Sequence, residues 1–404
     1  MNKLQTTKIK KCRLCKSNSF IHLHSYGNLF VSNFVEKKNI KKGIKAPLNL
    51  LYCKRCKLLQ LEHSAPQEIM YKRFYWYRSG VTQTMKLALK DIYNSVLKLK
   101  ILKKGDTVLD IGANDGTLLS YFKKQFVTVG CEPAKNLTKE LKKNCKFVLN
   151  DFWSFKKYLN ISKLQNLKPP KVITAIGMFY DLEDPSKFIR DAFHALDEDG
   201  VFIAQLMCLD SMIKKNDLGN VCHEHLEFYS YESLKYLFEK NGFKIYKVER
   251  NEINGGSYRV FCKKNIKKSI KVNEKTSLIE IKKFIKRVEV NKEKCLNFLK
   301  NAKLKKKKIF LYGASTKGNT LLQYYGLDSR TISYAAERSP EKWGKYTVGS
   351  GIKIISEAKA RSLKPDYFFV MPYGFINEFI KREKKWINQG GTFLLPYPFF
   401  KKVN

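Results

Sequence analysis

The sequence predicts an α/β protein with two Rossmann-like units and a small N-terminal metal-binding module. Strand and helix patterns alternate over residues 100–264, and the same alternation restarts near residue 306. Two C-x-x-C pairs near the N-terminus predict the module. At 404 residues, two or three domains are expected. The domains are a zinc-binding module (1–70), a central domain (71–264), a helical connector without chemistry (265–305) and a C-terminal nucleotide-binding domain (306–404).

The composition excludes a disordered chain and a membrane-spanning one. Hydrophobic residues make up 44% of the sequence and aromatic residues 13%, enough for packed cores. No apolar stretch approaches the roughly 20 residues that a membrane span needs. The segment Met1–Thr7 is polar and lacks the apolar core of a signal peptide. We therefore expect a soluble, cytoplasmic protein that does not insert into membranes.

The formal net charge of +42 indicates an anionic partner. Lysine is spread along the whole chain, however, and arginine, the residue that reads base edges, is sparse. A solvated lysine surface is therefore favoured and no nucleic-acid partner is expected, although a zinc-containing RNA-binding or RNA-modifying protein stays open as an alternative. The charge would also attract a small anion such as a nucleotide diphosphate.

The N-terminal cysteines form two knuckles, Cys12-x-x-Cys15 and Cys53-x-x-Cys56. Four thiolates on tight turns are the ligand set of a tetrahedral structural zinc, with no open position for catalysis. Redox-active thiols are the alternative. The other six cysteines are scattered without pairing, as expected in a reducing cytosol.

An unusually aromatic segment, residues 71–80, follows the module. The hydroxyl groups of Tyr75, Tyr77 and Ser79 could lie over a substrate, or the segment could simply pack between domains. Tyrosine suits both roles because it combines an apolar body with a polar tip.

A glycine-bearing turn, Asp110–Gly116, joins a buried strand to a helix in the central domain. Such a turn lets a ligand approach the backbone and the helix N-terminus. Glu132 ends the next strand, where a carboxylate can accept both ribose hydroxyls. The G-x-G-x-x-G fingerprint is missing, which argues against NAD, and acids on both sides of the loop, Asp110 and Asp115, favour a cationic nucleoside such as S-adenosylmethionine. The expected cofactor-binding residues are Asp110, Gly112, Asn114, Gly116, Glu132, Asn150 and Asp151.

The strands expected in this domain, 107–111, 126–131, 146–149, 171–176, 200–206 and 258–262, indicate a parallel, doubly wound sheet. Ligands bind at the carboxyl ends of such strands. Substrate contacts are therefore expected from Phe179 and Tyr180 after the fourth strand, and from Asn254 and Ser257 in a turn facing the same cleft.

The sequence Cys222-His223-Glu224-His225 lies beyond the fifth strand and carries the catalytic candidates. Histidine moves protons near neutral pH, and an adjacent carboxylate can raise its basicity. A general base is the favoured interpretation. A metal site and a structural polar turn are alternatives, although the histidine spacing differs from that of helical zinc proteases.

The C-terminal domain repeats the strand, loop and helix order, with a loop Gly313–Gly318 and a second strand that ends in Glu337. This loop carries Ser, Thr and Lys in place of acids, which favours phosphate over a cation. A vestigial turn is the alternative. The expected substrate-binding residues are Ser79 in the aromatic segment and Ser315, Thr316, Lys317, Asn319, Glu337 and Lys342 here.

Taken in order, these motifs resemble the three-domain sugar C-methyltransferases that act on nucleotide-linked 4-keto-6-deoxyhexoses. The resemblance covers essentially the entire chain. It rests on the paired C-x-x-C knuckles, the Tyr-x-Tyr-x-Ser segment, the Asp110–Gly116 loop, the His-Glu-His turn, Asn254–Ser257 and the Gly313–Asn319 loop.

The resemblance implies that His225 is the base and Glu224 its partner or a substrate contact, with His223, Tyr75 and Tyr77 as further catalytic candidates. It also implies a nucleotide-diphosphate sugar held by the C-terminal domain, methylated α to the ketone at C-3, for surface polysaccharide or glycosylated metabolite biosynthesis. Family members often carry tyrosine before His-Glu-His, and Cys222 stands there instead. An O- or N-methyltransferase on a nucleotide sugar or another metabolite, and a non-catalytic nucleotide-binding protein, are the remaining alternatives.

Overall fold

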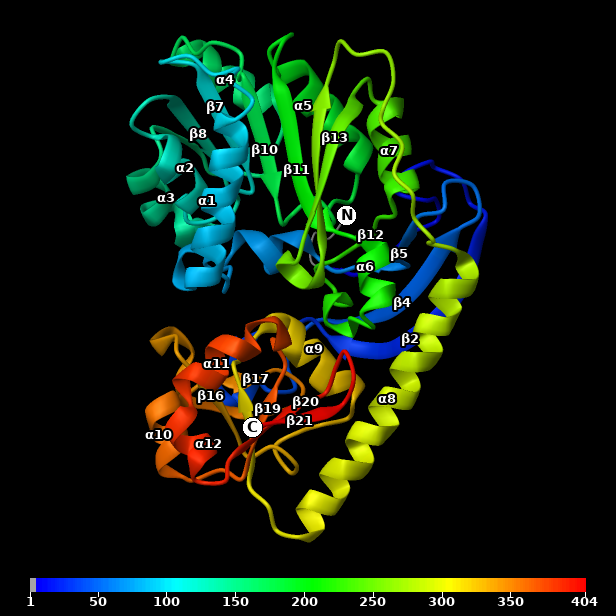
Figure 1. Cartoon of the computed structure of the whole chain (residues 1–404), viewed down its shortest axis with the longest axis vertical. Helices are drawn as coiled ribbons and strands as arrows, with labels where there is room; N and C mark the ends of the chain where they lie inside the picture. The colour runs from blue at the N-terminus through cyan, green and yellow to red at the C-terminus, as the bar shows by residue number, and fades with distance from the viewer. Residues whose placement is uncertain (1–4) are drawn as a thin grey trace.

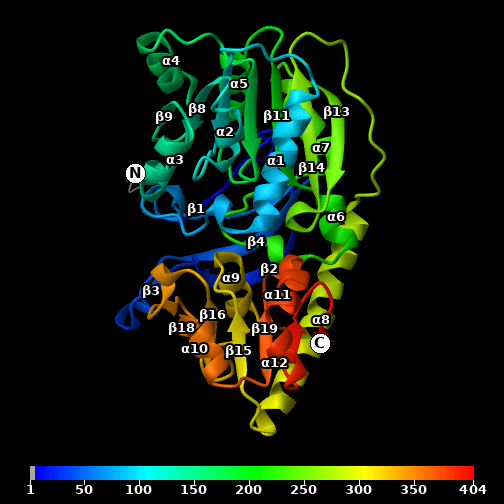
Figure 2. The same cartoon turned by 60° about the vertical axis from the view of Figure 1, so that its left-hand side comes forward.

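The computed structural model describes residues 5–404, so Met1 to Leu4 of the polar N-terminal segment lie outside the described residues. Two lobes lie one above the other, joined along one side by a long helix, α8 (Figures 1 and 2). The upper lobe contains the central domain and the lower lobe the C-terminal domain. Strands of the N-terminal module run along the boundary between them. Within residues 5–404, no helix is long and apolar enough to cross a membrane.

The N-terminal module is built on a four-stranded sheet of order β12-β5-β4-β2. Its own strands are β2 (Phe20–Phe30), β4 (Lys45–Cys53) and β5 (Leu59–Leu61). The fourth strand, β12 (Glu227–Phe228), comes from the central domain and directly follows the His-Glu-His segment. The module's remaining short elements are β1 (Thr7–Lys8), β3 (Phe34–Val35), η1 (Lys37–Asn39) and β6 (His63–Ser64).

The central domain is a seven-stranded sheet of order β13-β14-β11-β10-β7-β8-β9. Its strands are β7 (Thr107–Ile111), β8 (Val127–Cys131), β9 (Phe147–Leu149), β10 (Val172–Ile176), β11 (Val201–Met207), β13 (Lys244–Asn251) and β14 (Ser257–Lys263). All six predicted strands are present. The prediction of an all-parallel sheet is wrong at one edge, because β14 runs antiparallel to both β11 and β13. A short turn joins β13 to β14, and such a connection can only produce an antiparallel pair.

Helices cover both faces of this sheet. Apolar residues of α1, α2 and α3 pack on one face and those of α4, α5 and α7 on the other. Capping residues begin several of them: Thr82 accepts from Met85 N, and Asp184 accepts from Lys187 N ahead of Pro185. The helices are α1 (Gln83–Leu97), α2 (Thr117–Phe122), α3 (Thr138–Asn144), α4 (Phe155–Leu164), α5 (Pro185–Ala195), α6 (Leu209–Lys214) and α7 (Tyr231–Lys240). The short helical segments are η2 (Glu68–Lys72), η3 (Ser79–Val81), η4 (Lys135–Leu137), η5 (Leu218–Asn220) and η6 (Ile253–Gly255).

Helix α8 (Leu278–Leu304) lies within the stretch expected to connect the domains. Ser277 caps it by accepting from Glu280 N. Ile281, Val288 and Leu299 lie on its buried face, which packs into the core of the lower lobe, while the lysines of its other face are solvated.

The C-terminal domain is an eight-stranded sheet of order β21-β20-β19-β15-β16-β18-β17-β3, so the N-terminal module contributes its edge strand. The other strands are β15 (Ile309–Tyr312), β16 (Tyr334–Glu337), β17 (Tyr346–Thr347), β18 (Lys353–Ser356), β19 (Tyr367–Val370), β20 (Thr392–Leu395) and β21 (Lys401–Val403). The helices are α9 (Thr316–Tyr324), α10 (Glu357–Ser362), α11 (Ile376–Arg382) and α12 (Lys384–Asn388), with η7 (Pro340–Lys342) and η8 (Tyr373–Phe375).

Candidate functional site

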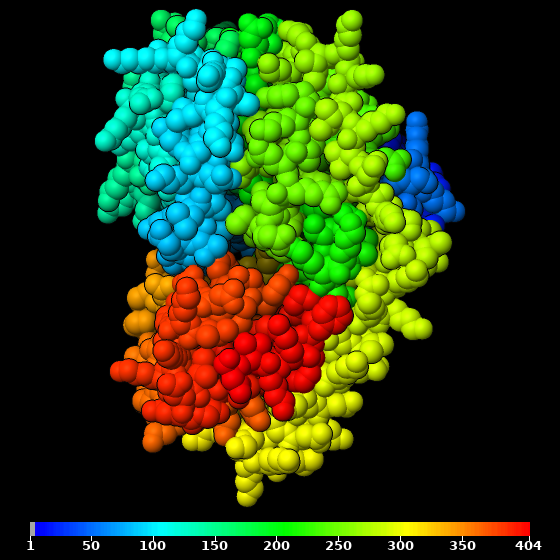
Figure 3. Space-filling model, viewed as in Figure 1, coloured from blue at the N-terminus to red at the C-terminus, as the bar shows by residue number. Residues whose placement is uncertain are grey.

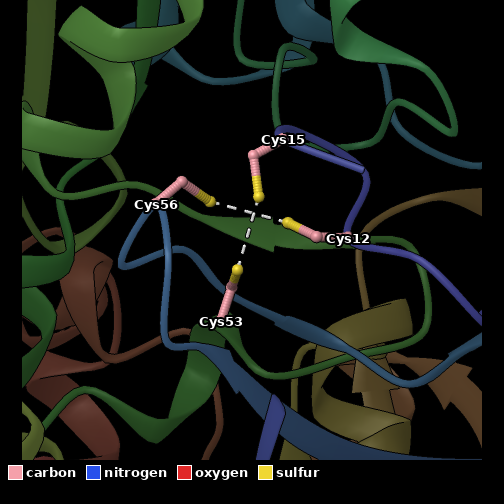
Figure 4. Close-up of side chains that lie close together, drawn as sticks. All are labelled: Cys12, Cys15, Cys53 and Cys56. Carbon is pink, nitrogen blue, oxygen red and sulfur yellow. Dashed lines mark hydrogen bonds between the residues drawn. The ribbon is translucent and has the colours of Figure 1, made fainter. Parts of the chain in front are cut away.

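The four knuckle cysteines meet in a buried cluster, with their Sγ atoms converging on one point (Figure 4). The Sγ atoms of Cys12 and Cys56 are 3.6 Å apart, and those of Cys15 and Cys53 are 3.5 Å apart. A tetrahedral zinc with Zn–S bonds of about 2.3 Å places its sulfurs roughly 3.8 Å apart, so the cluster fits the ion. Each short contact joins one knuckle to the other, as one shared ion requires. Gln60 Nε2 lies 3.1 Å from Cys12 Sγ and can support that thiolate.

A cavity of about 320 Å³ lies at the carboxyl ends of β7, β8 and β10. Gly112, Asn114 and Glu132 line it from the central domain, and Tyr71, Tyr75, Tyr77 and Ser79 line it from the aromatic segment. Gly112 has φ +76°, and a Cβ there would lie 2.6 Å from Met178 Cγ, so only glycine fits this turn. The site is of the kind that holds a nucleoside cofactor in an α/β sheet.

Glu132 lies on the wall of this cavity, as the ribose expectation requires. Its two carboxylate oxygens accept from Asn114 N at 2.9 Å and Ala134 N at 2.8 Å. Burial raises the pKa of Glu132 to about 7, although both hydrogen bonds lower it. Each oxygen keeps a second acceptor position, so the carboxylate can still bind two ribose hydroxyls.

The other two acids of the loop, Asp110 and Asp115, accept hydrogen bonds from neighbouring parts of the chain and do not line the cavity. Asp110 lies behind the loop and accepts from Thr174 Oγ1 at 2.6 Å, and burial raises its pKa to about 7. Asp115 accepts from Gly80 N at 2.7 Å and from Thr117 at the start of α2. Asp115 does not line the cavity, and both its oxygens accept hydrogen bonds from the chain itself, so any effect on a cationic ligand would act through its charge and not by contact.

Asn114 fastens the aromatic segment onto the cofactor loop. Its Oδ1 accepts from Ser79 N at 2.9 Å and its Nδ2 donates to the Tyr77 carbonyl at 3.1 Å. Gly116 has φ +78° and lies close to Asn144 and Leu141 of α3, so its role is helix packing.

Asn150 and Asp151 follow β9 as predicted, but their side chains support neighbouring segments. Asn150 donates to the Glu132 carbonyl at 2.8 Å. Asp151 pairs with Lys72 and Lys157, and although burial opposes them, these pairs lower its pKa to about 2. The cavity wall here is formed by Phe152 and Trp153, which the sequence analysis missed. The available signal was a pair of aromatic residues three and four positions beyond the strand end.

His225 is almost completely buried in the loop before β12, with its Nδ1 2.8 Å from the Asn220 carbonyl. A carbonyl can only accept, so Nδ1 carries the hydrogen and Nε2 is left with a free lone pair. Burial, followed by the charge of Lys317, holds the pKa of His225 well below its usual value. The expected increase in basicity from Glu224 is therefore wrong. The ring is neutral, which is the form a general base requires.

Neither His223 nor Glu224 is hydrogen-bonded to His225 within the part of the chain that the structure describes. His223 Nε2 lies 2.9 Å from the carbonyl of Ala46 in β4 and anchors the loop to the N-terminal module. The Glu224 carbonyl accepts from Tyr71 OH at 2.8 Å, whereas its buried Oε2 has no partner within residues 5–404. Cys222 is fully buried, and burial raises the pKa of its thiol well above the usual value, so it stays protonated.

Asp181 is a candidate that the sequence analysis missed. It follows Tyr180 after β10, lines the cavity, and has a buried Oδ1 without a hydrogen-bond partner among the described residues. Burial raises the pKa of Tyr75 well above its usual value, and the nearby charges of Asp181 and Glu224 add to this effect. A phenol and a carboxyl group, those of Tyr75 and Asp181, therefore line the cavity.

The remaining predicted residues of the central domain make contacts within the protein. Tyr180 packs edge-on against His225 with ring centroids 4.5 Å apart. The prediction that Phe179 contacts the substrate is wrong. Phe179 is fully buried and stacks on Phe238 in the domain core. The Asn254 carbonyl accepts from Asn220, and the Ser257 hydroxyl donates to the Ile253 carbonyl, so both residues shape the turn behind the site.

A second cavity of about 220 Å³ lies over the C-terminal loop. It is lined by Ser315, Thr316, Glu337 and Lys342, and by Trp76 and Tyr77 of the aromatic segment. Tyr77 thus borders both cavities. Glu337 binds the backbone N–H groups of Ala314, Arg338 and Ser339, which stabilises the loop. Asn319 is buried and bonded to Val348 and Ser350, so the expectation that it contacts substrate is wrong.

A seven-stranded sheet with an antiparallel strand at one edge, a glycine turn after β7 and a cavity bordered by Glu132 define an S-adenosylmethionine-dependent methyltransferase. Three family models match the chain in succession: a zinc binding domain (residues 12–71), a methyltransferase domain (82–248) and the C-methyltransferase C-terminal domain (252–398). The chain is an S-adenosylmethionine-dependent methyltransferase with the three-part organisation of the C-methyltransferases, containing a zinc-binding domain.

One relative matches over nearly the whole length. The C-methyltransferase NovU of Streptomyces niveus is 24% identical over 405 residues, which cover 96% of each chain. Among solved structures, magnesium protoporphyrin IX methyltransferase of Synechocystis PCC 6803 with bound SAM is 12% identical, with 44% of this chain and 78% of that chain covered and a TM-score of 0.33. An S-adenosylmethionine-dependent methyltransferase of Clostridium acetobutylicum ATCC 824 is 14% identical, covering 45% and 92%, with a TM-score of 0.32. Likeness at this level carries no argument about activity.

Proposed function

We propose that this enzyme methylates the carbon α to the ketone, C-3, of a nucleotide-linked 4-keto-deoxy sugar. The observation that carries the proposal is the state of His225, a neutral imidazole whose Nδ1–H is held by the Asn220 carbonyl. A C–H bond beside a ketone is acidic enough for such a base, because the resulting carbanion delocalises as an enolate. S-adenosylmethionine supplies the methyl group.

The two cavities suit the two ligands. The cavity beside Glu132 would hold the methyl donor, with the ribose on this carboxylate. The cavity over the C-terminal loop would take the nucleotide diphosphate, through the hydroxyls of Ser315 and Thr316 and the start of α9. Because Tyr77 borders both, a sugar extending from the second cavity towards the first would approach Tyr75 and Asp181, which line the first cavity.

Proton exchange tests the role of His225 without methyl transfer. With S-adenosylhomocysteine bound, the wild-type enzyme in D₂O should exchange the C-3 proton of a nucleoside diphosphate 4-keto-6-deoxyglucose, followed by NMR. His225→Ala should reduce turnover by roughly 10²–10⁴-fold and reduce exchange in parallel. His194→Ala, an exposed histidine on α5, is the matched control and should behave as wild type. Exchange at the wild-type rate in His225→Ala would transfer the role of base to Asp181 or Tyr75.

A further inference from the structure

Lys317, expected to bind phosphate, reaches out of its own domain. It lies in the first turn of α9, yet its Nζ is 3.3 Å from Asn220 Oδ1 in the upper lobe. Helix α9 lies at the top of the lower lobe, beside β2 of the N-terminal module and η5 of the central domain (Figure 1). The contact with Asn220 therefore joins the two lobes, whose boundary Figure 3 shows.

The cavity over the C-terminal loop is bordered by Ser315 and Thr316 but not by Lys317. Lys342 borders it, together with Arg338 and Arg382. Lys342 donates to the Ala314 carbonyl at 2.8 Å and to Glu337 at 3.2 Å, and thus stabilises the loop, whereas Lys317 reaches Asn220 in the upper lobe.

The ammonium group of Lys317 has unused donors. It is half-buried, and its single hydrogen bond, to the Asn220 amide oxygen, uses one of three N–H groups. No carboxylate of residues 5–404 lies within 4.0 Å of it as an ion-pair partner. The nearby carboxyl groups of Asp181 and Asp217 act on Lys317 by charge without pairing with it directly. A partly buried cation with free donors favours an incoming anionic oxygen.

Asn220 ties this cation to the base. Its main-chain carbonyl accepts from His225 Nδ1, and its side-chain oxygen accepts from Lys317. The amide is held in place because its Nδ2 donates to Asp217 and to the Asn254 carbonyl, each at 3.1 Å. Both side chains are thus held by contacts to one residue.

We propose that Lys317 is the oxyanion-stabilising residue of the methyl transfer, and does not bind the diphosphate; this assignment rests on the proposed function. His225 Nε2 takes the proton from C-3, and the C–H electron pair becomes the C-3–C-4 double bond. The carbonyl π pair moves onto the C-4 oxygen, and Lys317 donates a hydrogen bond to the resulting oxyanion. When the carbonyl reforms, the enolate pair forms the new C–C bond to the methyl group, and the C–S pair departs with sulfur.

The same geometry links Lys317 to the pH profile. The groups around His225 are Tyr180 after β10, which packs on the ring, the Asn220 carbonyl, which accepts from it, and Lys317 of α9, whose charge acts on it. Asp217 lies beyond Asn220, and the charges of Asp181 and Glu224 act on each other. Of these, Lys317 is the cation, and it lowers the pKa of His225. Its removal should raise that pKa, and the acidic limb of kcat/KM should move to higher pH.

The test uses Lys317→Met in the full-length enzyme, assayed with S-adenosylmethionine and nucleoside diphosphate 4-keto-6-deoxyglucose probes. We expect kcat and C-3 proton exchange to fall by roughly 10²-fold, the usual effect of removing one oxyanion donor. KM should change little, and the acidic limb should shift upward. Lys317→Gln keeps a hydrogen bond to Asn220 without the charge, and should show the same losses even if Lys317→Met is unstable.

Lys342→Met is the matched comparison, because it removes a lysine that borders the nucleotide cavity. It should raise KM and leave the acidic limb in place. A raised KM with unchanged kcat and exchange in both Lys317 variants would return Lys317 to the diphosphate and overturn this assignment, while the proposed function would stand. If the wild-type enzyme methylates none of the thymidine, uridine, cytidine and guanosine diphosphate probes, the proposed function fails and this assignment fails with it.

Discussion

Glu132 shows how one carboxylate serves both the fold and the proposed cofactor site. It accepts from Asn114 N and Ala134 N, which shapes the loop, and it borders the cavity with both oxygens able to accept again. A buried carboxylate with this arrangement is costly unless a ligand gains from it. The position of Glu132 therefore supports ribose recognition.

Replacement of Glu132 tests this role. Glu132→Ala should weaken S-adenosylhomocysteine binding at least tenfold, since each charge-assisted hydrogen bond is worth about 1.5–3 kcal/mol. Calorimetry on Glu132→Ala and Glu132→Gln, with the exposed Glu293→Ala as control, measures the effect. Wild-type affinity in both Glu132 variants would place the cofactor elsewhere.

The positions of residues at strand ends were predicted better than those of residues within loops. Glu132 and Gly112 lie where the spacing placed them, because strand and helix geometry fixes them. Phe179 lies in the loop three positions beyond the end of β10, and its side chain packs in the core. Asp181 and Trp153 were missed because a loop's path, and so the direction of its side chains, depends on contacts far away in the sequence.

At the scale of elements, a strand of the N-terminal module pairs with the strand that follows His225. Strand β12 begins two residues after His225 and pairs with β5, with Glu227 opposite Gln60. Gln60 in turn contacts Cys12 Sγ. Order at the zinc site should therefore extend to the loop that carries the base.

Removal of the metal should destabilise the protein. We expect one zinc per chain, lost in Cys12→Ser, with a lower Tm after this substitution or after chelation, because structural zinc contributes folding free energy. Elemental analysis and thermal denaturation measure both effects. Cys145→Ser, a buried cysteine outside the cluster, should keep its zinc. Stoichiometric zinc in Cys12→Ser would refute the site.

The elements that the sequence did not predict are those that join domains. Strand β13 was missed because its charged residues alternate irregularly along an exposed edge, and the antiparallel β14 follows from the turn between them. Strands β12 and β3 each join the sheet of another domain, and the sequence did not predict this. A strand of two residues has no sequence pattern of its own, because its partner strand determines where it pairs.

For the whole molecule, the site is assembled where all three parts meet. Strand β3 of the N-terminal module forms the edge of the C-terminal sheet, and β12 of the central domain forms the edge of the N-terminal module's sheet. The aromatic segment lies between the two cavities, with Arg78 bonded to Glu341 of the C-terminal domain at 3.1 Å. Neither lobe holds the base, both cavities and Lys317 alone. This explains why methyl transfer to a nucleotide-linked substrate would need the full chain.

The position of the transferred methyl group tests the central claim most directly. The wild-type enzyme, supplied with S-adenosylmethionine carrying a ¹³C methyl group and the panel of nucleoside diphosphate 4-keto-6-deoxyglucose probes, should give a product whose labelled methyl couples to the sugar carbon beside the ketone in the NMR spectrum. A labelled methyl on oxygen or nitrogen, or transfer that proceeds equally well to sugars without a ketone, would contradict the account.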